Sequence, residues 1–164
     1  MEDKEKKAVI ALWGPERTGK TTTLNFLIKS LGGPEGTEDQ RVRLSYKEEK
    51  KIAITTYGDD KVQLQKNIDF FNEESCDIYV TATRTKEGTV DALEAFEEDD
   101  ISTKAIWIYK SYLTYSELNL GKKGKPLKES ITAEQIKIIR NTINEKQAET
   151  IKLIIDNIIE EWEK

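Results

Sequence analysis

The sequence predicts a three-layer α/β sandwich around a mostly parallel, five-stranded sheet with one antiparallel edge strand. Apolar runs and helical patterns alternate along the chain, which is typical of domains in which helices cover a parallel sheet. One pair of neighbouring segments instead alternates apolar and polar residues, which predicts a β-hairpin. The length of 164 residues indicates one domain, residues 1–164, with a single core.

The first half of the chain predicts a strand, a helix and a hairpin. Residues 8–13 (AVIALW) form a continuous apolar run, as in a strand that is buried on both faces. Apolar residues then recur at helical spacing over residues 20–31, and the two glycines that follow end the helix. Residues 41–46 and 51–56 alternate apolar and polar side chains on either side of KEEK, which predicts the two strands of the hairpin.

The second half predicts two more strands and further helices. Apolar residues at helical spacing from 62 to 71 predict a helix, and residues 89–96 predict a shorter one. Residues 77–82 (DIYVTA) and 105–109 (AIWIY) predict buried strands. Residues 132–164 predict a long final helix with isoleucines on one face and Ala- and Gln-type residues as a weak point in its middle.

The stretch GPERTGKT, residues 14–21, lies between the first predicted strand and the first predicted helix. Gly14 and Gly19 permit backbone conformations that let successive N–H groups point at one anion, and the N-terminus of the helix adds its dipole. Lys20 can reach the β- and γ-phosphate oxygens of a nucleotide, and the Thr21 hydroxyl can ligate Mg²⁺. The residues expected to bind the nucleotide are Gly14, Pro15, Glu16, Arg17, Thr18, Gly19, Lys20, Thr21 and Thr22.

In these residues the chain resembles the P-loop NTPases, and the resemblance is specific over residues 8–31. It implies the P-loop NTPase fold, a nucleoside triphosphate ligand and Mg²⁺. The order of the predicted elements is similar to that of the small GTPases, whose second strand is antiparallel. This similarity implies that residues 33–40 occupy the place of the first switch, where Thr37 would complete the Mg²⁺ shell with Thr21.

The segment ITTYGDD lies where small GTPases carry D-x-x-G, and Thr55 stands in the place of the aspartate. Other P-loop families place an acid at the end of this strand, where it holds Mg²⁺ through water. Asp59 is the candidate for that role. Asp59 and Asp60 also suit the capping of the next helix, and the pair can serve both roles.

The guanine-reading N-K-x-D of the GTPases has no full counterpart in this chain. The register after the strand at residues 105–109 reads YKSY, so Lys110 is in place but neither polar reader is. ATP is therefore favoured over GTP. Lys110 or Tyr112 is a candidate to pack on the face of a base.

Lys20, Asp59 and Arg84 are the candidate catalytic residues. Phosphoryl transfer depends on positioning and on neutralising charge more than on covalent chemistry. Arg84 directly follows the strand at residues 77–82, at the end of the sheet where ligands bind, so it is expected to contact a phosphate or an acceptor. The alternative for Arg84 is a solvated loop arginine that pairs with a carboxylate.

The composition limits both the chemistry and the partners. The chain has no histidine, which removes the commonest general base, and its single cysteine favours a cytoplasmic protein. The net charge of −5 makes a nucleic-acid partner unlikely, and no apolar run reaches the ~18 residues of a membrane span. A protein partner or a homodimer stays open.

Together these patterns predict Mg²⁺-dependent binding of a nucleoside triphosphate and its hydrolysis by a switch-like or accessory ATPase. Two alternatives stay open. A small-molecule or nucleotide kinase would need an acceptor near Arg84, and the chain has no evident arginine-rich lid. A nucleotide-binding module without turnover is favoured by the missing D-x-x-G aspartate.

Overall fold

Five strands form one mixed sheet in the computed structural model, which describes residues 6–15, 18–36, 38–58, 60–73, 75–83, 103–110 and 133–164. The strands are β1 (Lys7–Trp13), β2 (Arg41–Tyr46), β3 (Lys50–Thr55), β4 (Ile78–Thr83) and β5 (Thr103–Tyr109). Their order across the sheet is β2-β3-β4-β1-β5. β2 pairs antiparallel with β3 at one edge, and the other neighbours pair in parallel. The predicted sheet and its antiparallel edge strand are confirmed.

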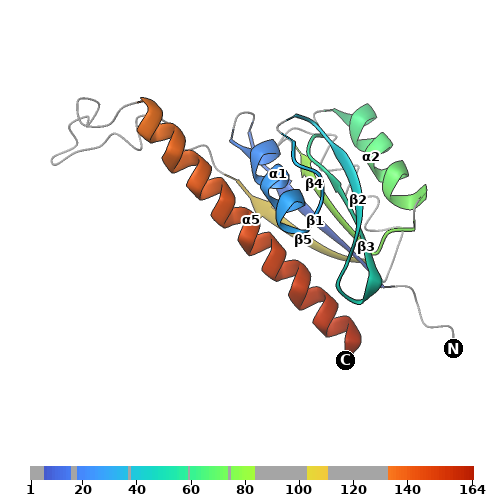
Figure 1. Ribbon diagram of the computed structural model, residues 1–164. Helices are drawn as coiled ribbons and strands as arrows, with labels where there is room; N and C mark the ends of the chain where they lie inside the picture. The colour runs from blue at the N-terminus through green and yellow to red at the C-terminus, as the bar shows by residue number, and fades with distance from the viewer. Residues whose placement is uncertain are drawn as a thin grey trace, which may run out of the picture.

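Helices cover both faces of this sheet (Figure 1). α1 (Lys20–Ser30) and α5 (Ala133–Glu163) pack on one face, and α2 (Lys61–Glu73) packs on the other. Successive side chains of a strand point to opposite faces, so Ile10 of β1 faces α1 and α5, whereas its neighbour Ala11 faces α2. β1 is therefore buried on both sides, as its continuous apolar run predicts.

Short polar contacts define where α1 ends and where α2 begins. Gly32 has a φ of 88°, and the N–H of Gly33 donates to the carbonyl of Ile28 at 2.8 Å, which ends α1. At the start of α2, Asp60 Oδ1 accepts a hydrogen bond from the N–H of Gln63 at 2.8 Å. The predicted capping role of the acidic pair is therefore confirmed for Asp60.

α5 is one continuous helix of 31 residues. Its C-terminal half buries Ile151, Ile155 and Ile158 against α1 and the sheet, whereas Ile138 near its start is 60% exposed. In Figure 1 the first turns of α5 extend beyond the sheet. The helix passes unbroken through the Ala- and Gln-type residues in its middle.

Two predicted segments lie outside the described residues. They are the short helix at residues 89–96 and the stretch from 111 to 132, which includes Tyr112. Within the described ranges, no helix combines the length and the apolar character that crossing a membrane requires.

Candidate phosphate-binding site

The carboxyl ends of four strands meet at one edge of the sheet, because β1, β3, β4 and β5 run in parallel. The chain leaves β1 through α1 towards the edge strand β2, whereas β4 is followed by β5 on the other side of β1. The β1–β4 pair is therefore the point at which the connections diverge, which is where open α/β sheets bind their ligands. At this point the N–H of Gly14 donates to the carbonyl of Thr83 at 3.3 Å.

Two glycines of GPERTGKT meet a steric requirement. Gly14 has a φ of 155° and Gly19 a φ of 87°, both in the region that favours glycine. A Cβ on Gly14 would also collide with the backbone carbonyl of Lys110, and a Cβ on Gly19 would lie 2.7 Å from the side-chain amide of Asn144. The loop can therefore lie this close to β5 and α5 only with glycine at both places.

α1 begins at this loop with Lys20 as its first residue and without a side-chain cap. Its first turn contains no acidic residue. The partial positive charge of a helix N-terminus favours anions and disfavours a cation such as Lys20. α2 also begins with a lysine, Lys61, but there the carboxylate of Asp60 caps the helix. The start of α1 therefore presents backbone N–H groups to the loop without a side-chain cap.

The Lys20 side chain folds back over the loop. Its Nζ donates to the carbonyl of Gly14 at 2.6 Å and to the carbonyl of Pro15 at 2.8 Å. The Thr18 hydroxyl donates to the same Pro15 carbonyl at 3.0 Å. These hydrogen bonds close the loop. An anion could replace the two carbonyl oxygens as the partner of the Lys20 ammonium, because phosphate oxygens are stronger partners for an ammonium than carbonyl oxygens are.

The Thr21 hydroxyl connects α1 to the end of β3. It donates to the backbone carbonyl of Thr56 at 2.9 Å. The Thr56 hydroxyl in turn accepts from the N–H of Gln40 at 2.8 Å, in the connection that precedes β2. The predicted Mg²⁺ ligand Thr21 therefore lies beside the strand end where the sequence predicts an acid.

Thr55, which stands in the place of the D-x-x-G aspartate, is part of the core. It is fully buried, and its hydroxyl makes hydrogen bonds with Tyr79 at 2.9 Å and with Thr81 at 2.8 Å. Burial raises the pKa of Tyr79 to about 12, so this group of hydroxyls stays neutral. Thr55 therefore bonds within the sheet and does not replace the missing carboxylate.

Lys110 lies behind the loop. It is 2% exposed, and its Nζ donates to Asn144 Oδ1 at 2.7 Å and to Gln147 Oε1, both on α5. Burial, and secondarily the charge of Lys20, lower the pKa of Lys110 to about 8. The predicted packing of Lys110 on a base face is therefore corrected, because its ammonium is directed to α5.

Asn144 and Gln147 are the residues of this site that the sequence analysis missed. They occupy the middle of α5, where polar side chains interrupt a face of isoleucines. In sequence such an interruption indicates a weak point of the helix. In the structure it is the place where two side-chain amides accept from the buried Lys110.

The nucleotide-binding candidates that the structure describes all lie at the edge of the sheet where the parallel strands end. They are Gly14, Pro15 and residues 18–22. The other predicted site residues lie outside the described residues, so their predictions are not tested; they are Glu16, Arg17, Thr37, Asp59 and Arg84. Among the residues that are described, no three His, Cys, Asp or Glu side chains form a group that could hold a metal ion. Of the three predicted Mg²⁺ ligands, Thr21 lies within the described residues, whereas Thr37 and Asp59 do not.

The chain matches no protein-family model, and no curated protein or solved structure is significantly similar to it.

Proposed function

We propose that the chain is a P-loop NTPase domain that binds a nucleoside triphosphate with Mg²⁺ at residues 14–22. We further propose that it hydrolyses the nucleotide, with ATP favoured over GTP, as a switch-like or accessory ATPase. The loop follows a buried parallel strand and opens a helix, which is the structural context that GxxxxGK[ST] requires.

The start of α1 is the observation that carries this proposal. Its N-terminal N–H groups have no side-chain cap, and the partial positive charge of a helix N-terminus favours an anion. The ammonium of Lys20, the first residue of the same helix, lies at the loop carbonyls of Gly14 and Pro15. A triphosphate would offer its oxygens to this ammonium and to the N–H groups of the loop.

The proposed roles follow from the positions of the described side chains. Lys20 would exchange the carbonyls of Gly14 and Pro15 for β- and γ-phosphate oxygens. Thr21 would hold Mg²⁺, with Asp59 and Thr37 completing the set, and the ion would neutralise charge on the phosphates. In hydrolysis a water oxygen bonds to the γ-phosphorus as the bond to the bridging oxygen breaks, and Lys20 and Arg84 would stabilise the charge that develops.

Nucleotide binding without turnover is the second candidate. It is favoured by Thr55, because the strand position that carries an aspartate in small GTPases here holds a hydroxyl that is committed to the core. The kinase alternative depends on Arg84. Phosphate release from nucleotide alone separates these functions: a hydrolase releases phosphate, a kinase requires an acceptor, and a binding module leaves the nucleotide intact.

The first test compares the thermal unfolding midpoint with ATP, GTP, ADP and GDP, each with and without Mg²⁺, in the parent chain and in Lys20→Ala. Nucleotide that binds the native state raises the midpoint, and the shift grows with the nucleotide concentration relative to its Kd. Because a charge-assisted hydrogen bond contributes about 1.5–3 kcal/mol, Lys20→Ala should weaken binding by about 10- to 150-fold and abolish most of the shift.

Lys61→Ala is the matched control, since Lys61 is also the first residue of a helix but one that Asp60 caps. It should leave the nucleotide-induced shift unchanged. An identical nucleotide affinity in the parent chain and in a folded Lys20→Ala variant would refute the assignment of the loop.

A further inference from the structure

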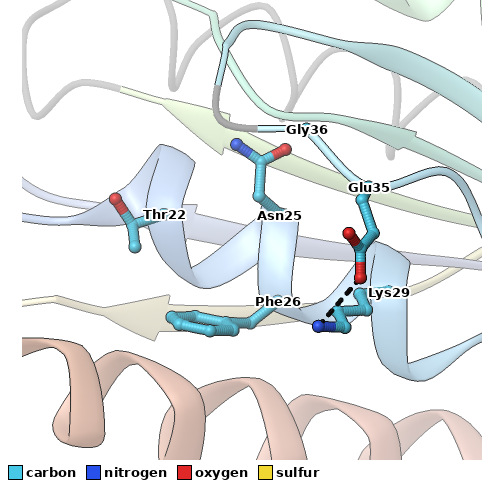
Figure 2. Close-up of a pocket in the computed structure, with 6 residues that line it drawn as sticks. All are labelled: Thr22, Asn25, Phe26, Lys29, Glu35 and Gly36. Carbon is cyan, nitrogen blue, oxygen red and sulfur yellow. Dashed lines mark ion pairs between the residues drawn. The ribbon is translucent and has the colours of Figure 1, made fainter.

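Two side-chain amides, those of Asn25 and Gln40, join α1 to the connection that precedes β2. Gln40 Nε2 donates to Asn25 Oδ1 at 2.6 Å, and Asn25 Nδ2 donates to the backbone carbonyl of Glu38 at 3.3 Å. Asn25 is 8% exposed, so its amide depends on these protein partners more than on water. In Figure 2 the Asn25 side chain extends from α1 towards the chain at Gly36. A Cβ on Gly36 would collide with the Gln40 side chain, so the connection packs closely on the same amide.

Gln40 is also joined to Thr56, at the end of β3. The N–H of Thr56 donates to the carbonyl of Gln40 at 3.0 Å, and the N–H of Gln40 donates to the Thr56 hydroxyl at 2.8 Å. The carbonyl of Thr56 accepts from the Thr21 hydroxyl at 2.9 Å. Thr56 is fully buried, so Gln40 fixes the orientation in which its carbonyl meets Thr21.

These contacts close a ring that begins and ends on α1 and passes through Thr21, Thr56, Gln40 and Asn25. We call it the polar ring. Thr21 and Asn25 are four residues apart, so they lie on the same face of α1. The polar ring therefore holds the first turn of α1, the end of β3 and the connection before β2 in one arrangement.

Thr21 takes part in this ring with its proton already committed. A threonine hydroxyl has one proton and two lone pairs, and here the proton goes to the Thr56 carbonyl. The oxygen therefore meets any further partner with its lone pairs, as a ligand of Mg²⁺ must. Mg²⁺ at phosphate sites takes few protein oxygens and completes its shell with phosphates and water, so a hydroxyl held in this way fits the ion.

We propose that the side-chain amides of Asn25 and Gln40 position the Thr21 hydroxyl for Mg²⁺, by fixing the Thr56 carbonyl that holds its proton. This inference rests on the proposed binding of a polyphosphate with Mg²⁺ at residues 14–22. It adds two positioning residues that act through Thr21. Outer-shell partners of this kind raise the affinity of a metal site by orienting its ligands.

The test measures how much Mg²⁺ strengthens the binding of tripolyphosphate, a ligand that has the phosphates of a nucleotide but no nucleoside. Titration calorimetry on the full chain gives the Kd with Mg²⁺ and the Kd with EDTA, and we call their ratio the Mg²⁺ advantage. Gln40→Met removes the amide from a side chain of similar length, and Asn25→Ala removes its acceptor. Each should lower the Mg²⁺ advantage by about 10-fold, the lower end of the range for outer-shell partners, and should leave the Kd with EDTA within about twofold.

The double variant Gln40→Met/Asn25→Ala should lose no more of the Mg²⁺ advantage than either single variant, because both substitutions break the same hydrogen bond. Gln65→Met is the matched control, since the Gln65 amide also donates to a side-chain oxygen, that of Asp69, but on the exposed face of α2. It should change neither Kd. Thr21→Val removes the proposed ligand itself and should abolish the Mg²⁺ advantage.

Two results would overturn the inference while the proposed function stands. In the first, Thr21→Val abolishes the Mg²⁺ advantage but Gln40→Met and Asn25→Ala keep the parent value. In the second, these two variants weaken binding equally with Mg²⁺ and with EDTA, which would show that the polar ring only supports the fold. If the parent chain shows no Mg²⁺ advantage, or does not bind tripolyphosphate at all, the proposed function itself fails and the inference fails with it.

Discussion

Lys110 is the residue whose burial has the clearest measurable consequence. Its pKa is lowered from an ordinary value near 10.5 to about 8, first by burial and then by the charge of Lys20. Its two side-chain partners, Asn144 and Gln147, are neutral amides. The native chain therefore releases this proton near pH 8, whereas the unfolded chain keeps it to about pH 10.5.

This difference predicts that the free energy of unfolding gains a favourable contribution as the pH rises from about 8 to about 10.5. In that window the unfolded state binds more protons than the native state, which is the condition for stability to increase with pH. The contribution should be absent from Lys110→Met. Urea unfolding at several pH values measures this contribution, with Lys61→Met, which removes an exposed lysine, as the control. Parallel pH profiles for the parent chain and Lys110→Met would contradict the prediction.

At the scale of elements, the GPERTGKT loop lies close to α5 because Gly19 has no side chain. Gly19→Ala should destabilise the chain, because its Cβ meets Asn144 and because a φ of 87° strains alanine. Left-handed backbone costs a non-glycine residue roughly 1–2 kcal/mol even without a collision. Asn144→Ala should also destabilise, since Lys110 loses an acceptor.

The double variant Gly19→Ala/Asn144→Ala distinguishes the two terms. The shorter side chain at 144 removes the collision but not the backbone strain, so the double variant should lose less stability than the sum of the two single variants. Urea unfolding of all four chains gives the coupling energy. A strictly additive result would show that the loop does not press on α5 at this point.

The same elements show what local sequence can and cannot predict. The strands, α1, α2, α5 and the hairpin were predictable because apolar runs and periodicity are local. The position of Lys20 and Thr21 between a strand and a helix was predictable because the motif is contiguous. The contact of Thr21 with Thr56 spans 35 residues, and that of Lys110 with Asn144 spans 34. Such contacts depend on the order of the strands and on the placement of α5, neither of which is encoded in a local pattern.

At the scale of the whole molecule, the described residues form two cores, one on each face of the sheet, and of these two the core shared with α5 supports α1. Ile28 of α1 is fully buried in the core shared with α5, and Ile68 of α2 is 4% exposed in the core on the opposite face. The GPERTGKT loop leads into α1, and Lys20 is the first residue of that helix, so both belong to the first side. Changes in the two cores should therefore have similar effects on stability and different effects on binding.

Ile28→Ala and Ile68→Ala form a matched pair that tests this separation. Each removes the same buried atoms and should lower the free energy of unfolding by about 2–5 kcal/mol, measured by urea unfolding. Ile28→Ala should also weaken the binding of Mg²⁺-tripolyphosphate, because a cavity beneath α1 would loosen the helix whose first turn is proposed to hold the anion. Ile68→Ala should leave that affinity unchanged at temperatures where the chain is folded. Equal losses of affinity would mean that the sheet transmits changes between its faces, and the loop would then depend on the α2 core as much as on the helix that carries Lys20.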